Sequence, residues 1–134
     1  MKVSRVSSLV AMVAVVTLVL SGVAYAHTVV WPTGLSISRS PEGKVAPGKM
    51  VTFSGRLTSE KKACVRDSRI NLVKAGVVVA HRRTDGVGRY VIHHRVRHTA
   101  HWRVHFAGKV LNVVHPHNHT CAASWSSRIR VRVK

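Results

Sequence analysis

Acidic side chains are scarce in this sequence. Only four of the 134 residues are Asp or Glu, against 22 Lys and Arg, and they are scattered as Glu42, Glu60, Asp67 and Asp85. So few carboxylates exclude calcium cages, paired-acid hydrolysis and magnesium-assisted phosphoryl transfer, all of which need several acids together. Neither a Gly-x-Ser-x-Gly nor a His-Glu-x-x-His motif is present. We therefore expect a protein that is not an enzyme.

Long apolar runs are also lacking, with one exception near the start of the chain. Residues 9–20 form an apolar run of twelve, which is too short to span the roughly 30 Å of a bilayer core. Lys2 and Arg5 precede the run, and the small residues of Ala24-Tyr25-Ala26 follow it. This pattern predicts a secretory signal peptide over residues 1–26, cleaved after Ala26. The mature domain, residues 27–134, is then expected to lack a transmembrane segment and to be secreted or held in the cell envelope.

Cysteine is limited to two residues, Cys64 and Cys121, and both lie in the predicted mature chain. A cysteine pair in a small exported domain predicts a disulfide, which would stabilise the fold by about 4 kcal/mol through closure of a long loop. A thiolate metal site would need more ligands, and no Cys-x-x-Cys motif is present. A cysteine nucleophile beside a histidine is the remaining alternative, and no motif supports it.

The apolar residues that are present follow a period of two rather than 3.6. Short alternating runs occupy residues 35–39, 51–57, 70–72, 77–80, 90–96, 102–106 and 129–133. Runs of this length and spacing predict an all-β fold, an antiparallel β-sandwich of about seven strands. We expect the strand ending at Arg97 and the strand beginning at Ala100 to form a hairpin. Residues 108–124 are expected to form one long loop.

Two segments resemble known families of secreted modules. Residues 45–55, VAPGKMVTFSG, are similar to the entry into the second strand of bacterial immunoglobulin-like modules. Val78-Val79-Ala80 followed by residues 84–90, TDGVGRY, resembles a turn of transthyretin-like and carboxypeptidase-regulatory-like domains. The resemblance implies an immunoglobulin-like sandwich in an adhesive, spacer or carbohydrate-proximal unit. It also implies that Asp85 binds backbone amides in the turn, that Gly88 has a positive φ and that Tyr90 enters the core.

Basic residues dominate the charge. The whole chain carries a formal charge of +18, and loss of Lys2 and Arg5 with the signal peptide would leave +16. In the expected hairpin, Arg95 faces Arg103 and His93 faces His105, and like charges so placed repel. Unopposed charge predicts a polyanionic partner, such as an anionic cell-wall polymer or polysaccharide, anionic lipid or extracellular DNA. The candidate binding residues are Arg95, Arg97, Arg103, Arg128, Arg130 and Arg132.

One alternative to polyanion binding by this surface remains open. The basic surface is alternatively a solvated face that keeps an exported protein soluble. Sequence-specific recognition of nucleic acid is not expected, because no predicted helix is available to enter a groove. Trp31 and Trp125 lie near strand ends, where they either pack at the edge of the sandwich or offer a surface for stacking of sugars.

Histidine is abundant, with ten residues in the chain. His115, His117 and His119 alternate within five residues and suit Zn²⁺, Cu²⁺ or Ni²⁺, although a polar loop without metal is the favoured explanation, because no carboxylate lies nearby in the sequence. Cleavage after Ala26 would make His27 the first residue, whose amine and ring nitrogen together would chelate copper. The sequence thus predicts a non-enzymatic binding or structural module of the cell envelope. Copper or zinc binding through His27 or the cluster at residues 115–119 is the alternative.

Overall fold

The computed structural model describes residues 27–114 and 117–134, and the predicted signal peptide lies outside the described residues. The described regular structure is β-strand apart from one short helix, α1 (Lys62–Val65), so the all-β prediction is confirmed. The strands are β1 (His27–Trp31), β2 (Gly34–Leu35), β3 (Ser38–Ser40), β4 (Lys49–Thr58), β5 (Arg69–Lys74), β6 (Val77–Arg83), β7 (Arg89–Val96), β8 (Ala100–Phe106), β9 (Lys109–Val114), β10 (His117–Cys121), β11 (Ser124–Trp125) and β12 (Ile129–Val131). The described residues form no helix that is long and apolar enough to cross a membrane.

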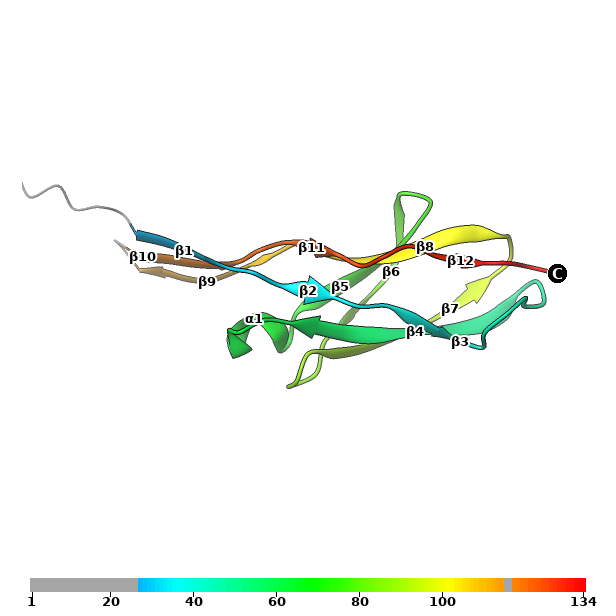
Figure 1. Cartoon of the computed structure of the whole chain (residues 1–134), viewed down its shortest axis with the longest axis horizontal. Coiled ribbons are helices and arrows are strands. Elements are labelled where there is room, and N and C mark those ends of the chain that lie inside the picture. The colour runs from blue at the N-terminus through cyan, green and yellow to red at the C-terminus, as the bar shows by residue number, and fades with distance from the viewer. Residues whose placement is uncertain (1–26, 115–116) are drawn as a thin grey trace, which may run out of the picture.

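Two antiparallel sheets form the body of the molecule (Figure 1). In the first sheet, β4 pairs with β7 on one side and with β2 and β3 on the other. In the second sheet, β8 pairs with β5, which pairs with β6, and on its other side β8 pairs with β11 and β12. The strand segments outnumber the expected seven partly because the outer partners of β4 and β8 are each broken into two short pieces.

The core draws its side chains from both sheets. Along β8, Trp102, Val104 and Phe106 are buried, and the residues between them point outward. Phe53 of β4 packs against Trp102, with 5.0 Å between ring centroids. Because successive side chains of a strand point to opposite faces, the alternation read in the sequence is also the alternation between core and surface.

The expected hairpin between β7 and β8 is wrong. The two strands lie in different sheets, and residues 97–99 cross from one sheet to the other. The register places Met50 opposite Arg95 and Asn71 opposite His105, so the predicted pairs of arginines and of histidines do not form. Both strands bury one apolar face, and each finds its hydrogen-bonding partners within its own sheet.

The expected long loop after residue 108 is also wrong. β9 and β10 form an antiparallel hairpin, and β1 pairs with β10 in parallel to complete a third sheet. This three-stranded arm extends beyond the two sheets, at the end opposite the C-terminus (Figure 1). The valine-rich sequence of β9 favours extended structure. A parallel partner from the first described residues cannot be found from local sequence, because parallel strands are joined by distant connections.

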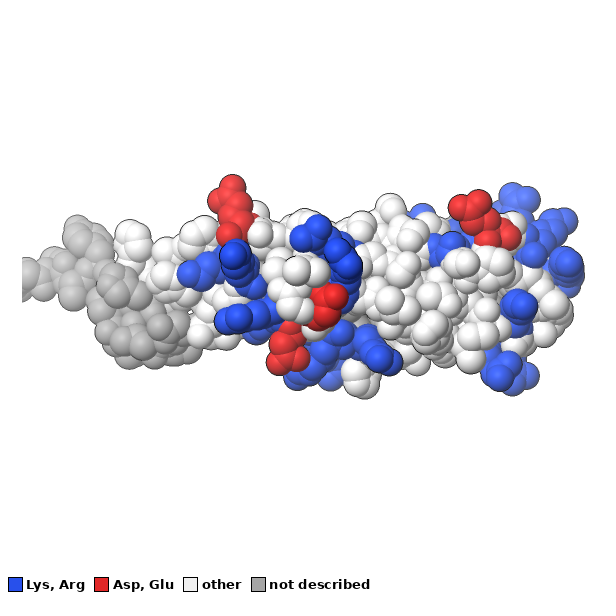
Figure 2. Space-filling model, turned by 90° about the horizontal axis from the view of Figure 1, so that it is seen from below, with Lys and Arg blue, Asp and Glu red and all other residues white. Residues whose placement is uncertain are grey.

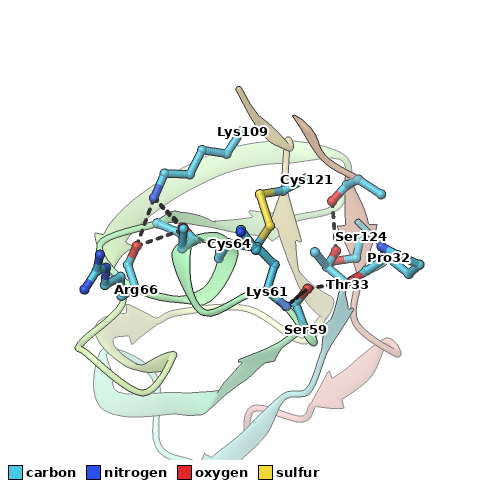
Figure 3. Close-up of a disulfide and its surroundings, with 12 residues drawn as sticks. Pro32, Thr33, Ser59, Lys61, Cys64, Arg66, Lys109, Cys121 and Ser124 are labelled. Carbon is cyan, nitrogen blue, oxygen red and sulfur yellow. Dashed lines mark hydrogen bonds between the residues drawn. A yellow bond between two sulfur atoms is a disulfide. The ribbon is translucent and has the colours of Figure 1, made fainter. Parts of the chain in front are cut away.

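A disulfide and a lysine fasten the base of the arm to α1 (Figure 3). The predicted bond between Cys64 and Cys121 is confirmed, with 5.6 Å between the two Cα atoms. The Nζ of Lys109 on β9 donates hydrogen bonds to the carbonyl oxygens of Ala63 and Arg66, each at 3.0 Å. The ammonium thereby satisfies carbonyl groups that so short a helix leaves without intrahelical partners.

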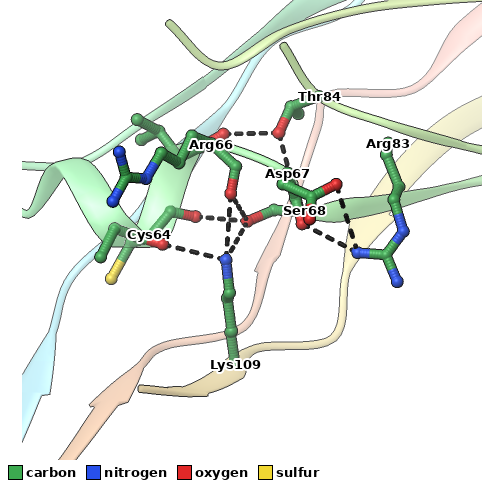
Figure 4. A network of polar contacts seen from close by, with 9 residues as sticks. Cys64, Arg66, Asp67, Ser68, Arg83, Thr84 and Lys109 are labelled. Carbon is green, nitrogen blue, oxygen red and sulfur yellow. Dashed lines mark hydrogen bonds and ion pairs between the residues drawn. The ribbon is translucent and has the colours of Figure 1, made fainter. Parts of the chain in front are cut away.

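Buried hydroxyl groups hold α1 against the strands that follow it (Figure 4). The Ser68 hydroxyl donates to the carbonyl of Cys64 at 2.7 Å, and the Ser68 amide donates to Thr84 Oγ1 at 2.9 Å. Thr84 Oγ1 in turn donates to the carbonyl of Val65. Because each of these buried groups has a partner, the network avoids the free-energy penalty of unsatisfied polar atoms.

The turn before β7 has the local structure that the family resemblance implies. Asp85 Oδ1 accepts hydrogen bonds from the amides of Val87 at 3.0 Å and Arg89 at 2.9 Å, and these amides hold the pKa of the carboxyl below its usual value. Gly88 has a φ of 88°, and a Cβ there would lie 2.2 Å from the carbonyl oxygen of Leu57. Tyr90 is 2% exposed, burial raises its pKa, and its hydroxyl donates to the carbonyl of Ser36 at 2.6 Å.

Candidate functional site

The outer surface of the second sheet gathers basic, aromatic and hydrogen-bonding side chains from all of its strands. We call this surface the β8 face. It consists of His81 on β6, Arg69 and Asn71 on β5, His101, Arg103 and His105 on β8, Trp125 on β11, Arg128 before β12, and Arg130 on β12. Their inward neighbours on β8, β5 and β12 include the core residues Trp102, Leu72 and Val131.

The strand register arranges these residues in rows. One row crosses four strands, from His81 through Asn71 and His105 to Trp125. Residues directly opposite each other on antiparallel strands share a face, so the four side chains lie on one side of the sheet. Basic residues stand two positions away in both directions, about 7 Å along each strand. Arg69 opposite Arg83 lies on one side of the row, and Arg103 lies on the other.

Trp125 is held in place by two neighbours and yet exposed. The guanidinium carbon of Arg103 lies 3.7 Å from the centroid of the indole ring. The His105 ring stacks on the same indole with 3.9 Å between centroids and 24° between planes. Nevertheless 47% of Trp125 is exposed. The cation–π and stacking contacts fix the ring's orientation, which lowers the conformational entropy that a ligand would have to remove.

A cavity lies on either side of the central row. The larger, of about 400 Å³, is lined by His101, Arg103 and Arg128 together with the turn at Ala75 and Gly76. The smaller, of about 220 Å³, is lined by residues that include Arg69, Asn71, Arg83, Lys109 and Asp67. Asp67 Oδ1 lies 3.6 Å from Arg83 Nη1 (Figure 4). This carboxylate offsets one of the three positive charges that line the smaller cavity, whereas no carboxylate lines the larger one.

Two histidines, one on each sheet, have lowered pKa values. The pKa of His105 on the β8 face is lowered mainly by burial and, to a smaller extent, by the positive charge of Arg103. The pKa of His94 is lowered mainly by burial and, to a smaller extent, by the positive charge of Lys74. His94 points inward from β7, and its ring lies edge-on to Trp102 with 5.5 Å between ring centroids. Neutral imidazole offers both a donor and an acceptor. His105 therefore presents a hydrogen-bonding group rather than another positive charge at neutral pH.

These lowered pKa values predict that acid destabilises the fold. In the unfolded chain the pKa of each histidine is about 6.5, so the unfolded state takes up a proton at each imidazole at a higher pH than the folded state does. The free energy of unfolding therefore decreases as pH falls from about 6.5 through the lowered values. Thermal melting between about pH 7.5 and about pH 5 should show this decline, and the double variant His94→Gln, His105→Gln should show a smaller one. An equal decline in both proteins would contradict the assignment.

The predicted polyanion-binding arginines do not share one face. Arg103, Arg128 and Arg130 lie on the β8 face. Arg132 is the residue directly after β12. Arg95 projects from the first sheet, where its Nη1 donates to the carbonyl of Gly48 at 3.1 Å, and Arg97 lies in the crossing segment. The prediction of a single surface that contains all six arginines is therefore wrong, because β7 and β8 belong to different sheets. Binding of polyanions by any of them stays a prediction.

Basic residues are not confined to the β8 face. Figure 2 shows Lys and Arg on the side of the molecule that carries β4, in one group near the C-terminal end and another around the middle, each interspersed with acidic residues. What distinguishes the β8 face is the exposed Trp125 beside cavities lined by arginine. Sequence reasoning missed Asn71, His81 and Arg69 as parts of this site, although the alternation within β5 and β6 already placed them outward.

Of the histidines proposed as metal ligands, His27 lies on β1, and His117 and His119 lie on β10 of the arm. The register places His27 opposite His117 and Val29 opposite His119. His115 and the side chain of His117 lie outside the described residues. Among the side chains that the structure describes, no group of three or more His, Cys, Asp or Glu is placed to hold a metal ion. Trp31, at the base of the arm, is partly buried, with the Lys61 ammonium 5.5 Å from its ring centroid.

Comparison of the chain with protein-family models, curated proteins and solved structures found no match.

Proposed function

We propose that this chain is an exported, non-catalytic, immunoglobulin-like β-sandwich that binds anionic polymers of the cell envelope through the β8 face. The strand orders of the two sheets support this topology, since β4 between β3 and β7, and β8 between β12 and β5, match the usual central strands of such sandwiches. The disulfide is typical of exported proteins. The observation that carries the proposal is the convergence of Arg103, Arg128 and Arg130 on one outer sheet surface.

Electrostatics supplies the reason why these three arginines bind a polymer rather than a single small anion. Arg130 lies opposite His101, and Arg103 and Arg128 line the same cavity, so the charges form a strip across β8 and β12. A polymer that lies along this strip releases several condensed counterions at once. Its affinity is therefore expected to fall linearly with salt on a logarithmic plot.

The test compares two triple variants of equal charge. Arg103→Ser, Arg128→Ser, Arg130→Ser removes the β8 strip, whereas Arg56→Ser, Arg89→Ser, Arg95→Ser removes three exposed arginines from the outer surface of the first sheet. Binding of dextran sulfate would be measured at about 50 mM and about 200 mM salt. We expect the β8 variant to lose about tenfold or more in affinity and to show a shallower salt slope, and the control to lose about threefold or less.

Equal losses in the two triple variants would overturn the proposal. That result would mean that only the summed charge matters, as expected for a solvated basic surface. Both variants should retain the wild-type melting temperature to within a few degrees, because outward arginines contribute little to the core. A melting curve of each variant therefore separates loss of binding from loss of fold.

Metal binding is the second candidate, and the register of the arm favours it. The parallel pairing of β1 with β10 places His27, the first residue after the predicted cleavage site, opposite His117, and places His119 opposite Val29, two positions further along β1. Two histidines at alternate positions of one strand and a third on the neighbouring strand suit Zn²⁺ or Cu²⁺. Calorimetry with each ion on protein beginning at His27 should show binding that persists at about 0.5 M salt and is lost in His119→Asn. Unchanged binding in that variant would exclude this site.

A further inference from the structure

We infer that the ligand of the β8 face is an acidic polysaccharide, with a sugar ring stacked on Trp125 and its acidic group held between Arg103 and Arg128. The inference rests on the proposed function and names the class of polymer. It follows from the order of the rows on the sheet: a row of His81, Asn71, His105 and Trp125, which contains no Lys or Arg, lies beside the basic residues that line the larger cavity.

Trp125 supplies the part of the site that charge does not explain. An exposed indole is unfavourable in water, and here its orientation is fixed by Arg103 at 3.7 Å and His105 at 3.9 Å. The C–H face of a pyranose ring is apolar and packs against an aromatic face, which removes apolar area from water on both partners. Polyphosphate has no apolar face to offer, so Trp125 would contribute little to binding a simple phosphate polymer.

The cavity supplies the acid-binding part. Arg103 contacts Trp125 and also lines the cavity of about 400 Å³, so one guanidinium lies between the stacking surface and the anion site. Arg128 and His101 line the same cavity. A guanidinium binds a carboxylate or sulfate through two parallel hydrogen bonds, which fixes the direction of the acidic group relative to the sugar ring. Stacking and ion pairing can therefore act on one sugar unit.

The rest of the central row suits sugar hydroxyl groups. Asn71 lies directly opposite His105, and His81 lies opposite Asn71 on β6. Amide and neutral imidazole groups both donate and accept hydrogen bonds, as hydroxyl groups do. Burial and Arg103 lower the pKa of His105, which favours this neutral form. The four strands, each about 4.8 Å from the next, give the row the length of a short run of sugar units.

Single-stranded nucleic acid is the less favoured occupant. Such strands are bound by several aromatic side chains that stack successive bases. On the described part of the chain Trp125 is the only exposed Trp, Tyr or Phe, while Trp102, Phe106 and Phe53 are buried in the core. One stacking surface beside one arginine-lined cavity fits a repeating acidic sugar better than a row of bases.

The experiment uses the mature protein and four probes: polygalacturonate, its methyl ester, polyphosphate and oligodeoxythymidylate. Trp125→Ala should weaken binding of polygalacturonate about tenfold or more and leave binding of polyphosphate within about twofold, whereas Trp125→Phe should retain most of the affinity. The methyl ester keeps the sugar rings and loses the carboxylates, so it should bind poorly to every variant. The triple variant Arg103→Ser, Arg128→Ser, Arg130→Ser should lose both charged polymers.

The outcomes separate this inference from the proposed function. If Trp125→Ala binds polygalacturonate as well as the wild type does, the saccharide inference is wrong, and the arginine variant alone decides on polyanion binding. If oligodeoxythymidylate binds more tightly than polygalacturonate and depends as strongly on Trp125, nucleic acid is the ligand and the inference is overturned. If the arginine variant binds every polymer normally, the proposed function itself fails.

Discussion

Replacement of both half-cystines, Cys64→Ala with Cys121→Ala, is expected to lower the free energy of unfolding by about 4 kcal/mol. The two residues are 57 positions apart, so the bond removes much of the conformational entropy of the unfolded chain. In the folded protein the same bond joins α1 to the end of β10, where the arm leaves the body. Urea unfolding, followed by tryptophan fluorescence, measures the loss.

Reduction of the wild-type protein provides the control for this prediction. A thiol reductant should bring the wild type to the stability of the double variant, and the variant itself should not respond to the reductant. A loss of less than about 1 kcal/mol would show that the Lys109 hydrogen bonds to α1 and the strand pairing hold the arm without the bond.

Trp102→Ala is expected to destabilise the protein by about 3–5 kcal/mol, the second large effect. Trp102 is 1% exposed and packs against Phe53 between the two sheets. The Lys74 ammonium lies 5.6 Å from the centroid of its ring. Truncation leaves a cavity where the two sheets meet and removes the aromatic partner of the cation, and the surrounding β-structure can fill the space only in part.

Trp125→Ala is the matched control, because Trp125 lies on the outer side of the same sheet. We expect its loss to destabilise the protein by less than about 1 kcal/mol. Chemical denaturation of the two variants side by side measures the difference. Comparable losses would contradict the assignment of Trp102 to the core and Trp125 to the binding surface.

The sequence predicted correctly those features that depend on neighbouring residues, such as the positions of strands and the faces of their side chains. Alternation of apolar and polar residues predicted the strands now seen as β4, β5, β6, β7, β8 and β12. It also predicted that Trp102 and Val104 face inward and Arg103 outward. Two cysteines allow only one intramolecular pairing, so the disulfide followed from the count once export was assumed.

Strand partners are set by contacts between distant residues, and here sequence reasoning failed. Residues 97–99 are short enough for a hairpin turn, yet they connect two sheets, because β7 and β8 each bury a face against the opposite sheet. The arm was missed because its central strand, β10, pairs with β1, which lies far away in the sequence. The same limitation separated Arg95 from Arg103 and concealed the row that joins Asn71 to His105.

The chemical shifts of ¹⁵N-labelled protein that begins at His27, titrated with a short oligogalacturonate, test the central claim most directly. We predict that the largest changes occur at the indole N–H of Trp125 and at the amides of Arg103, His105 and Asn71, which lie together on the β8 face. Amides on the outer surface of the first sheet, such as Arg56 and Arg89, should change little. Largest changes on β4 and β7, or changes spread evenly over all basic surfaces, would contradict the assignment of the binding site to the β8 face.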